Sequence, residues 1–134
     1  MRVLIDNNLP PALARALHEL SDAQEDVPVT HLRDKFHAAT ADIDWINALA
    51  HEGGWIVISQ DRLRKSPLER EALRRSGLVF FLLEKGWSNH TFWEKSQNLV
   101  RWWPAILEQA DRIVDGAAFL VPWQFSGKGK FKQA

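Results

Sequence analysis

Short, almost continuously apolar stretches alternate along the chain with longer stretches in which apolar residues recur every three or four positions. The first kind predicts buried strands, and the second kind predicts amphipathic helices. The predicted strands are residues 2–5, 29–32, 55–59 and 78–83, and the predicted helices are residues 12–20, 43–51, 67–76 and 91–113. Strict alternation of strand and helix predicts an α/β fold with a mainly parallel sheet and right-handed crossovers.

Proline, glycine and polar residues mark the ends of these elements. Pro11 suits the start of the first helix, and Asp42 is expected to be the N-cap of the second. Residues 21–28 and 33–40 are polar and predict loops. Pro104 is expected to kink or split the last helix, because proline removes a helical hydrogen bond.

The composition is that of a single domain. The chain has 134 residues and no cysteine, which excludes disulfides, thiolate metal sites and a cysteine nucleophile. We expect one domain over residues 1–125 and a flexible basic tail over residues 126–134. No apolar run approaches the roughly 18 residues of a membrane span, and the first residues lack the pattern of a secretory leader, so the expected location is the cytoplasm.

The net charge is zero but unevenly distributed. Residues 1–61 contain 4 Lys and Arg against 10 Asp and Glu, whereas residues 62–134 contain 13 against 7. Such asymmetry indicates a cation site beside a surface that binds a polyanion, although chance clustering on a solvated surface would look the same.

Carboxylates occupy the positions where a parallel sheet places its ligands, beyond the carboxyl ends of strands. Asp6 follows the first strand and Asp61 follows the third, while Asp42 and Asp44 begin the helix that leads into the third strand. If the two strands are neighbours, these acids converge, and a cation must offset their repulsion. Mg²⁺ and Mn²⁺ prefer oxygen ligands, so the pattern predicts metal-assisted phosphodiester hydrolysis.

Each acid also has a purely structural explanation. Asp6 can cap the first helix, Asp42 can be an N-cap, Asp44 can complement a helix dipole, and Asp61 can open a turn.

Other polar residues near these strand ends are candidates for supporting roles. Asn8 and Ser59 can orient a water or a ligand carboxylate, or simply hydrogen-bond within turns. Basic residues that could grip RNA phosphates follow directly after Asp61, and these are Arg62, Arg64, Lys65, Arg70, Arg74 and Arg75. The alternative is a solvated helix face whose arginines pair with Glu69 and Glu71. The tail lysines, Lys128, Lys130 and Lys132, could extend this surface.

Seven tryptophans are many for this length. Trp87, Trp102, Trp103 and Trp123 could stack on bases, but core packing or a homodimer interface on the tryptophan-rich helix is the simpler explanation. The five histidines show no HExxH or closely paired spacing, so none is assigned to a metal.

Four segments carry a resemblance to a known family. Residues 3–10 (VLIDNNLP), 42–46 (DIDWI), 55–62 (WIVISQDR) and 78–87 resemble the PIN-like domains, in particular the small bacterial branch near the VapC-type toxins. The resemblance covers roughly residues 1–90. It implies a three-layer Rossmann-like PIN fold, a Mg²⁺ or Mn²⁺ cofactor, and an endoribonuclease that is the toxin of a type II toxin–antitoxin pair, with a cognate antitoxin as partner.

Carried over by position, the resemblance implies that Asp6 and Asp61 are metal ligands and that Asp44, helped by Asp42, is the helical acid. A fourth acid, often found after the third in such nucleases, is not evident here, because basic residues occupy residues 62–65. Only Glu69 lies near enough to replace it.

Two other functions fit the same residues. A non-catalytic PIN-like module would bind RNA or a protein partner without turnover. A phosphotransfer receiver also clusters aspartates at strand ends and needs a lysine after a later strand, where Lys85 stands. The expected middle-strand phosphoacceptor is missing after residues 29–32, which disfavours the receiver.

Overall fold

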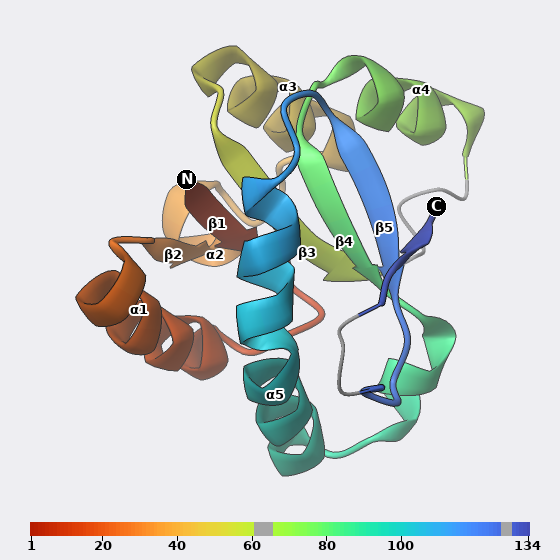
Figure 1. Cartoon of the computed structure of the whole chain (residues 1–134). Coiled ribbons are helices and arrows are strands. Elements are labelled where there is room, and N and C mark those ends of the chain that lie inside the picture. The colour runs from red at the N-terminus through yellow and green to blue at the C-terminus, as the bar shows by residue number, and fades with distance from the viewer. Residues whose placement is uncertain (61–65, 127–129) are drawn as a thin grey trace.

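A six-stranded sheet forms the centre of the protein in the computed structural model, which describes residues 1–60, 66–126 and 130–134 (Figure 1). The strand order is β2-β1-β3-β4-β5-β6; the first five strands are parallel and β6 is antiparallel to β5. The strands are β1 (Arg2–Ile5), β2 (Val29–His31), β3 (Trp55–Gln60), β4 (Val79–Leu83), β5 (Ala117–Val121) and β6 (Lys132–Gln133). The predicted α/β class with a mainly parallel sheet is confirmed.

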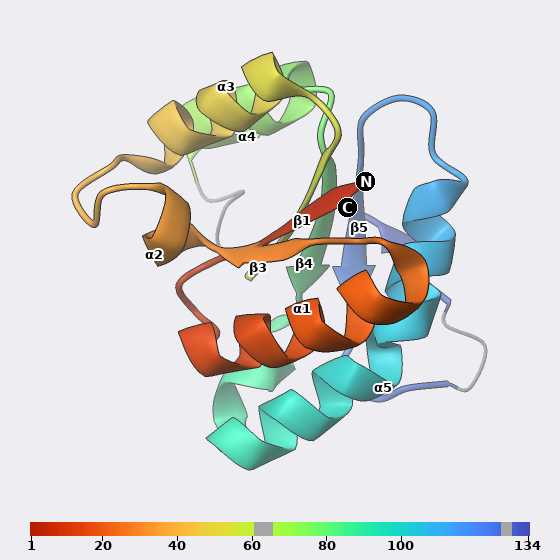
Figure 2. The same ribbon diagram turned by 90° about the vertical axis from the view of Figure 1, so that its left-hand side faces the viewer.

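Helices cover both faces of the sheet, which gives three layers (Figure 2). In the described residues the helices are α1 (Pro11–Glu25), α2 (Leu32–Lys35), α3 (Asp42–Glu52), α4 (Pro67–Arg75) and α5 (Phe92–Asp111), with a 3₁₀ helix at Lys85–Asn89. None of the described helices combines the length and apolar character that crossing a membrane requires.

The two faces of the sheet bury two separate apolar cores, because successive strand residues point to opposite sides. Val3 and Ile5 pack with α1 and α5, whereas Leu4 packs with α3 and α4. All six residues of β3 except Gln60 are buried, as expected for a central parallel strand covered on both faces. The carboxyl ends of the five parallel strands therefore lie at one edge of the sheet, with helix ends on either side of it.

Helix α1 continues to Glu25, so the loop predicted for residues 21–28 is wrong over its first five residues. Buried Ser21 accepts a hydrogen bond of 2.6 Å from the indole Nε1 of Trp103 in α5. This tertiary contact extends the helix through a polar sequence. The helix ends where Asp26 adopts a left-handed conformation with φ 56°.

Two further local predictions are corrected by tertiary context. Part of the loop expected over residues 33–40 forms the short helix α2, directly after β2. Pro104 lies inside α5, which runs unbroken from Phe92 to Asp111. Both Pro104 and Val100, whose carbonyl loses its helical partner, are exposed, so water can satisfy that carbonyl at little cost.

Residues 130–134 lie in the described part of the chain and contact the sheet and its core. Lys132 pairs with Leu120 of β5, and the ring of Phe131 lies 5.2 Å from those of Phe81 and Trp102. The Phe131 side chain thus packs against the core directly before β6, a contact that the Gly- and Lys-rich composition does not indicate. Lys128 lies outside the described residues.

A capping box begins α5 and gives a first prediction. Thr91 accepts a hydrogen bond from the Glu94 backbone N–H at 3.3 Å, and the Glu94 carboxylate accepts one from the Thr91 N–H at 2.8 Å. We expect Thr91→Ala to lower the free energy of unfolding by about 1 kcal/mol. Urea denaturation would measure this loss, and Thr40→Ala, outside any helix, should change stability by less than about 0.5 kcal/mol.

The same box should show a defined pH dependence. The Thr91 backbone and side-chain hydrogen bonds hold the pKa of Glu94 below its ordinary value. A carboxyl group with a lowered folded-state pKa stabilises the fold above its unfolded-state pKa and loses that contribution as pH falls through the folded-state value. The stability advantage over Glu94→Gln should therefore disappear in acid; an advantage that persists at pH 2 would contradict this assignment.

Candidate functional site

Asp6 lies against the end of β3, because β1 and β3 are neighbours in the sheet. The register pairs Ile5 with Ile58, and the Asp6 N–H donates to the Ile58 carbonyl at 3.0 Å. The Ser59 hydroxyl donates to the Asp6 carboxylate oxygen Oδ2. Both side chains are buried, with Asp6 1% exposed. The sheet thus brings together two of the residues that the sequence singled out.

The second carboxylate oxygen of Asp6 is bound within its own turn. Oδ1 accepts a hydrogen bond of 2.6 Å from the Asn7 N–H, and the Leu9 N–H closes the turn on the Asp6 carbonyl at 3.1 Å. The N-cap of α1 is Pro10, with no side-chain capping bond, so the helix-capping explanation for Asp6 is wrong. One donor on each oxygen fixes the carboxylate and leaves a further lone pair on each.

Asn8 supplies an unpaired oxygen in the same turn. Its Oδ1 is buried and has no hydrogen-bond partner in the described structure. A buried acceptor without a partner costs free energy, so such an atom calls for a ligand or an ordered water. Asp6 and Asn8 thus contribute oxygen donors from one turn, and oxygen is the donor type that Mg²⁺ and Mn²⁺ prefer. These residues therefore fit the metal that the sequence predicted.

The two helical acids occupy different environments at the start of α3. The N-cap is Ala41 rather than Asp42, which corrects the predicted cap. Asp42 instead accepts a hydrogen bond of 3.0 Å from the indole Nε1 of Trp45, a fully buried residue, and so anchors the first turn to the core. Asp44 is exposed in the same turn. Both lie at the edge of the sheet where β2 ends, because α3 follows the crossover from that strand.

Only part of the predicted acidic cluster lies in the described residues. Asp61 lies outside the described residues, as do Arg62, Arg64 and Lys65. Among the residues that are described, no group of three or more His, Asp or Glu side chains is arranged to hold a metal ion. The structure thus places Asp6, Ser59 and Asn8 at one strand end and leaves the third acid, Asp61, as a prediction.

The described arginines of α4 are largely occupied by a neighbouring acid. Glu71 forms ion pairs with Arg74 and with Arg75, the latter at 2.6 Å. Arg70 is exposed in the preceding turn. For Arg74 and Arg75, pairing along a solvated helix face is thus the arrangement found, and RNA binding by them would require competition with Glu71.

The tryptophans serve mainly as core residues. Trp87, Trp102 and Trp103 are at most 5% exposed, which contradicts a base-stacking role for them. Trp123 is partly buried and stacks on His90 at a ring distance of 3.5 Å. Trp93 on α5 is 71% exposed, so it is the tryptophan of that helix that remains available to a partner.

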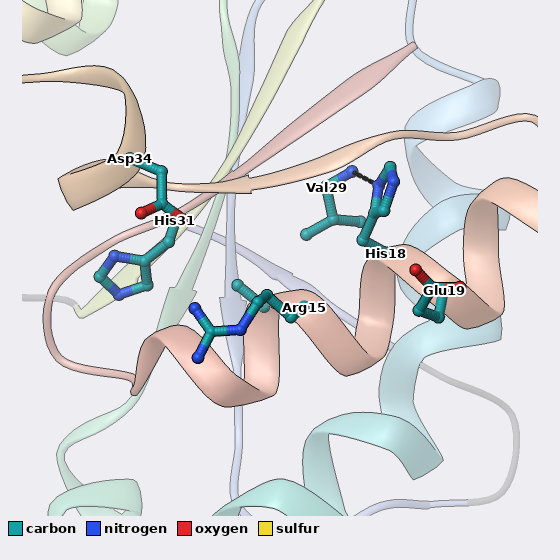
Figure 3. Close-up of a pocket in the computed structure, with 7 residues that line it drawn as sticks. Arg15, His18, Glu19, Val29, His31 and Asp34 are labelled. Atoms are coloured by element: carbon teal, nitrogen blue, oxygen red, sulfur yellow. Dashed lines mark hydrogen bonds between the residues drawn. The ribbon is translucent and has the colours of Figure 1, made fainter.

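A small hollow of about 210 Å³ lies between α1 and β2 (Figure 3). His18 and His31 both line it, and one ring nitrogen of His18 and both of His31 bind backbone groups. His18 Nδ1 accepts from the Val29 N–H at 3.0 Å, and buried His31 spans the Leu9 carbonyl and the Arg33 N–H. These bonds tie the two histidines to the backbone of residues 9, 29 and 33.

A shifted pKa marks a different, structural cluster. Hydrogen bonds from Lys35 and from the Trp55 indole hold the pKa of Glu52 below its ordinary value. Lys35 Nζ lies 3.0 Å from the Glu52 carboxylate. Because Trp55 begins β3, this cluster lies at the amino end of the strand, opposite to Asp6, and ties α2 to the end of α3.

The structure adds residues that the sequence analysis missed. The parallel register pairs Ile5 with His31, so Asn7 and Arg33, each two residues further on, leave the sheet side by side. Arg33 Nε donates to Asn7 Oδ1 at 3.1 Å. Continuing the register beyond both strand ends could have found this pair, but the neighbouring strand order had first to be known.

Comparison with known proteins adds one finding. A family model described as PIN like domain matches residues 1–85, which span β1 to β4 and the beginning of the 3₁₀ helix. No curated protein and no solved structure matches the chain. The match covers more than half of the chain, names no toxin branch, and decides against a phosphotransfer receiver.

Proposed function

This chain belongs to the PIN-like domain family, a nuclease-type family, and we propose that it is a metal-dependent endoribonuclease that hydrolyses RNA phosphodiester bonds. The observation that carries the proposal is the position of Asp6. It is a buried carboxylate at the end of a central strand, fixed by the Ser59 hydroxyl and the Asn7 N–H. Precise orientation of an acid by such donors is what a metal ligand requires.

Asp6, Asp61 and Asp44 would hold Mg²⁺ or Mn²⁺, with Asn8 Oδ1 as a further oxygen for the ion or for one of its waters. When bound, the metal would lower the pKa of a bound water and offset the charge that develops on the phosphate. Asp61 is included because it follows directly after β3, the strand whose end contacts Asp6.

Other residues of the protein would orient the metal ligands and bind the RNA backbone. Ser59 and the Asn7 backbone keep the Asp6 carboxylate in one orientation. Asp42 supports the site by binding the Trp45 indole, which fixes the helix turn that carries Asp44. Arg70, with Arg62, Arg64 and Lys65 of the preceding segment, would bind the RNA backbone, and Arg74 would join them only if it left Glu71.

We further propose that the cleavage serves as the toxin of a type II toxin–antitoxin pair, with a cognate antitoxin protein as partner. The support is the likeness of residues 3–10, 42–46 and 55–62 to the VapC-type branch. Homodimerisation through α5 is part of the same hypothesis, because Trp93 and Val100 of that helix are 71% and 41% exposed.

A non-catalytic module that binds RNA or a protein is the second candidate. It is favoured by the basic residues Arg62, Arg64 and Lys65, which stand where PIN nucleases often carry a fourth acid. Such a module would bind RNA with a strong salt dependence and would show no turnover with any divalent ion.

The proposal predicts that removing divalent ions stops cleavage. The purified protein, dialysed against EDTA, should leave a fluorescently labelled single-stranded RNA intact. Adding Mg²⁺ or Mn²⁺ back should raise the cleavage rate at least about a hundredfold over the chelated protein. Adding Na⁺ alone should not raise it. Undiminished cleavage in excess chelator would contradict metal catalysis. Binding without cleavage under all of these conditions would establish the non-catalytic module instead.

A further inference from the structure

We propose that Arg33 is an RNA phosphate-binding residue of the candidate site, positioned for that role by Asn7. The inference rests on the proposed function in that it places the RNA backbone beside Asp6. It differs from the sequence prediction, which located the basic residues of the site on the opposite side of β1, after β3.

Two hydrogen bonds fix Arg33 relative to the turn that carries Asp6. Its Nε donates to Asn7 Oδ1 at 3.1 Å, and its backbone N–H donates to His31 Nδ1 at 3.1 Å. The other His31 nitrogen, Nε2, lies 2.7 Å from the Leu9 carbonyl. Both bonds therefore lead back to residues 7–9, so that the base of α2 and the Asp6 turn form one hydrogen-bonded unit.

Among the described residues, no acid forms an ion pair with Arg33. Its side chain is exposed and makes no ion pair in the described part of the structure; its side-chain bond is to a neutral amide. Lys35, two residues on, is neutralised by Glu52, and Arg74 by Glu71. A fixed guanidinium with unused N–H donors has the geometry that binds phosphate oxygens.

Asn7 connects Arg33 to Asp6, because it forms a hydrogen bond with each of them. Asn7 donates its backbone N–H to Asp6 Oδ1 and accepts the Arg33 Nε–H on its side chain. An anion held by Arg33 would therefore be separated from the carboxylate that would hold the metal by a single residue, Asn7. Placing the two groups on adjacent strand ends suits a phosphodiester, whose charge one group binds while the other directs the cleavage chemistry.

RNA binding in chelator, where cleavage is absent, tests the inference separately from turnover. The probe is a fluorescein-labelled single-stranded RNA of mixed sequence, and fluorescence anisotropy gives Kd over a range of salt concentrations. We expect Arg33→Ala to raise Kd by roughly tenfold at low salt and to reduce the slope of log K against log salt by about 0.7. Arg33→Lys should keep the slope and recover only part of the affinity.

Two further variants separate positioning from net charge. Asn7→Ala keeps the backbone N–H on Asp6 and should raise Kd by less than Arg33→Ala, with no added effect in the double variant. Arg101→Ala removes one exposed charge from α5 and should change neither Kd nor slope. The inference is overturned if Arg33→Ala binds RNA like the wild type, if it matches Arg101→Ala, or if the wild type does not bind RNA. A wild type that binds through Arg33 but never cleaves would refute only the nuclease.

Discussion

Replacing Asp6 by Asn is expected to lower RNA cleavage by more than about a hundredfold, beyond the loss typical of residues that only support a metal ligand. The amide keeps the shape of the side chain. Its oxygen can still accept the Asn7 N–H, and its NH₂ group can donate to the Ser59 oxygen, which reverses its role. What is lost is the negative charge that a divalent ion requires. Cleavage of labelled RNA by the purified variant, with Mg²⁺ or Mn²⁺ present, measures the effect.

A remote acid provides the matched control for this substitution. Asp22 is exposed near the end of α1, far along the chain from the Asp6 turn, and Asp22→Asn removes the same charge. It should leave cleavage within about twofold of the wild type. Circular dichroism and the unfolding midpoint must show that Asp6→Asn is folded. A folded Asp6→Asn protein that cleaves RNA at the wild-type rate would end the site assignment.

Replacing Phe81 by Ala is expected to lower the free energy of unfolding by about 3–5 kcal/mol. Phe81 is fully buried on β4, and its ring lies 5.4 Å from that of Phe119 and 5.2 Å from that of Phe131. Truncation removes apolar contact in the centre of the sheet and also loosens the Phe131 side chain directly before β6. Because whole domains are stable by only about 5–15 kcal/mol, this loss should be visible as partial unfolding at moderate temperature.

Urea denaturation followed by circular dichroism measures this effect. Phe92→Ala is the control, because Phe92 is 44% exposed at the start of α5; its substitution should cost less than about 0.5 kcal/mol. Phe81→Leu keeps most of the apolar volume, so its loss in free energy of unfolding should lie between those of Phe81→Ala and Phe92→Ala. Equal losses for Phe81→Ala and Phe92→Ala would mean that the aromatic cluster does not stabilise the fold as its burial implies.

The positions of β1 to β4 and the fold class followed from local pattern, because they depend on side chains close together in sequence, whereas β5 and β6 were not predicted. The apolar runs at residues 2–5 and 55–59 lie inside β1 and β3, with Gln60 added to the second. Helix ends were less certain, because long-range contacts decide them. The hydrogen bond from Trp103 to Ser21, 82 residues apart, is one reason that α1 reaches Glu25, and no local pattern contains it.

For the candidate site too, the sequence indicated individual residues, whereas their contacts required the structure. Asp6, Asn8, Ser59 and Asp61 could be singled out from their places at predicted strand ends. The contact between Asp6 and Ser59 could not be predicted, because it depends on β3 lying next to β1 in the sheet. The binding of Asp42 to Trp45 and the pairing of Arg74 with Glu71 also needed side-chain positions.

The order of apolar and polar residues by itself determined an α/β domain with acids after its central strands, since burial of strands and helices is a property of each segment. Only the tertiary structure decided which strand ends meet. Register between β2, β1 and β3 is set by packing of the whole sheet, and it places Ser59 on one side of the Asp6 turn and Arg33 on the other.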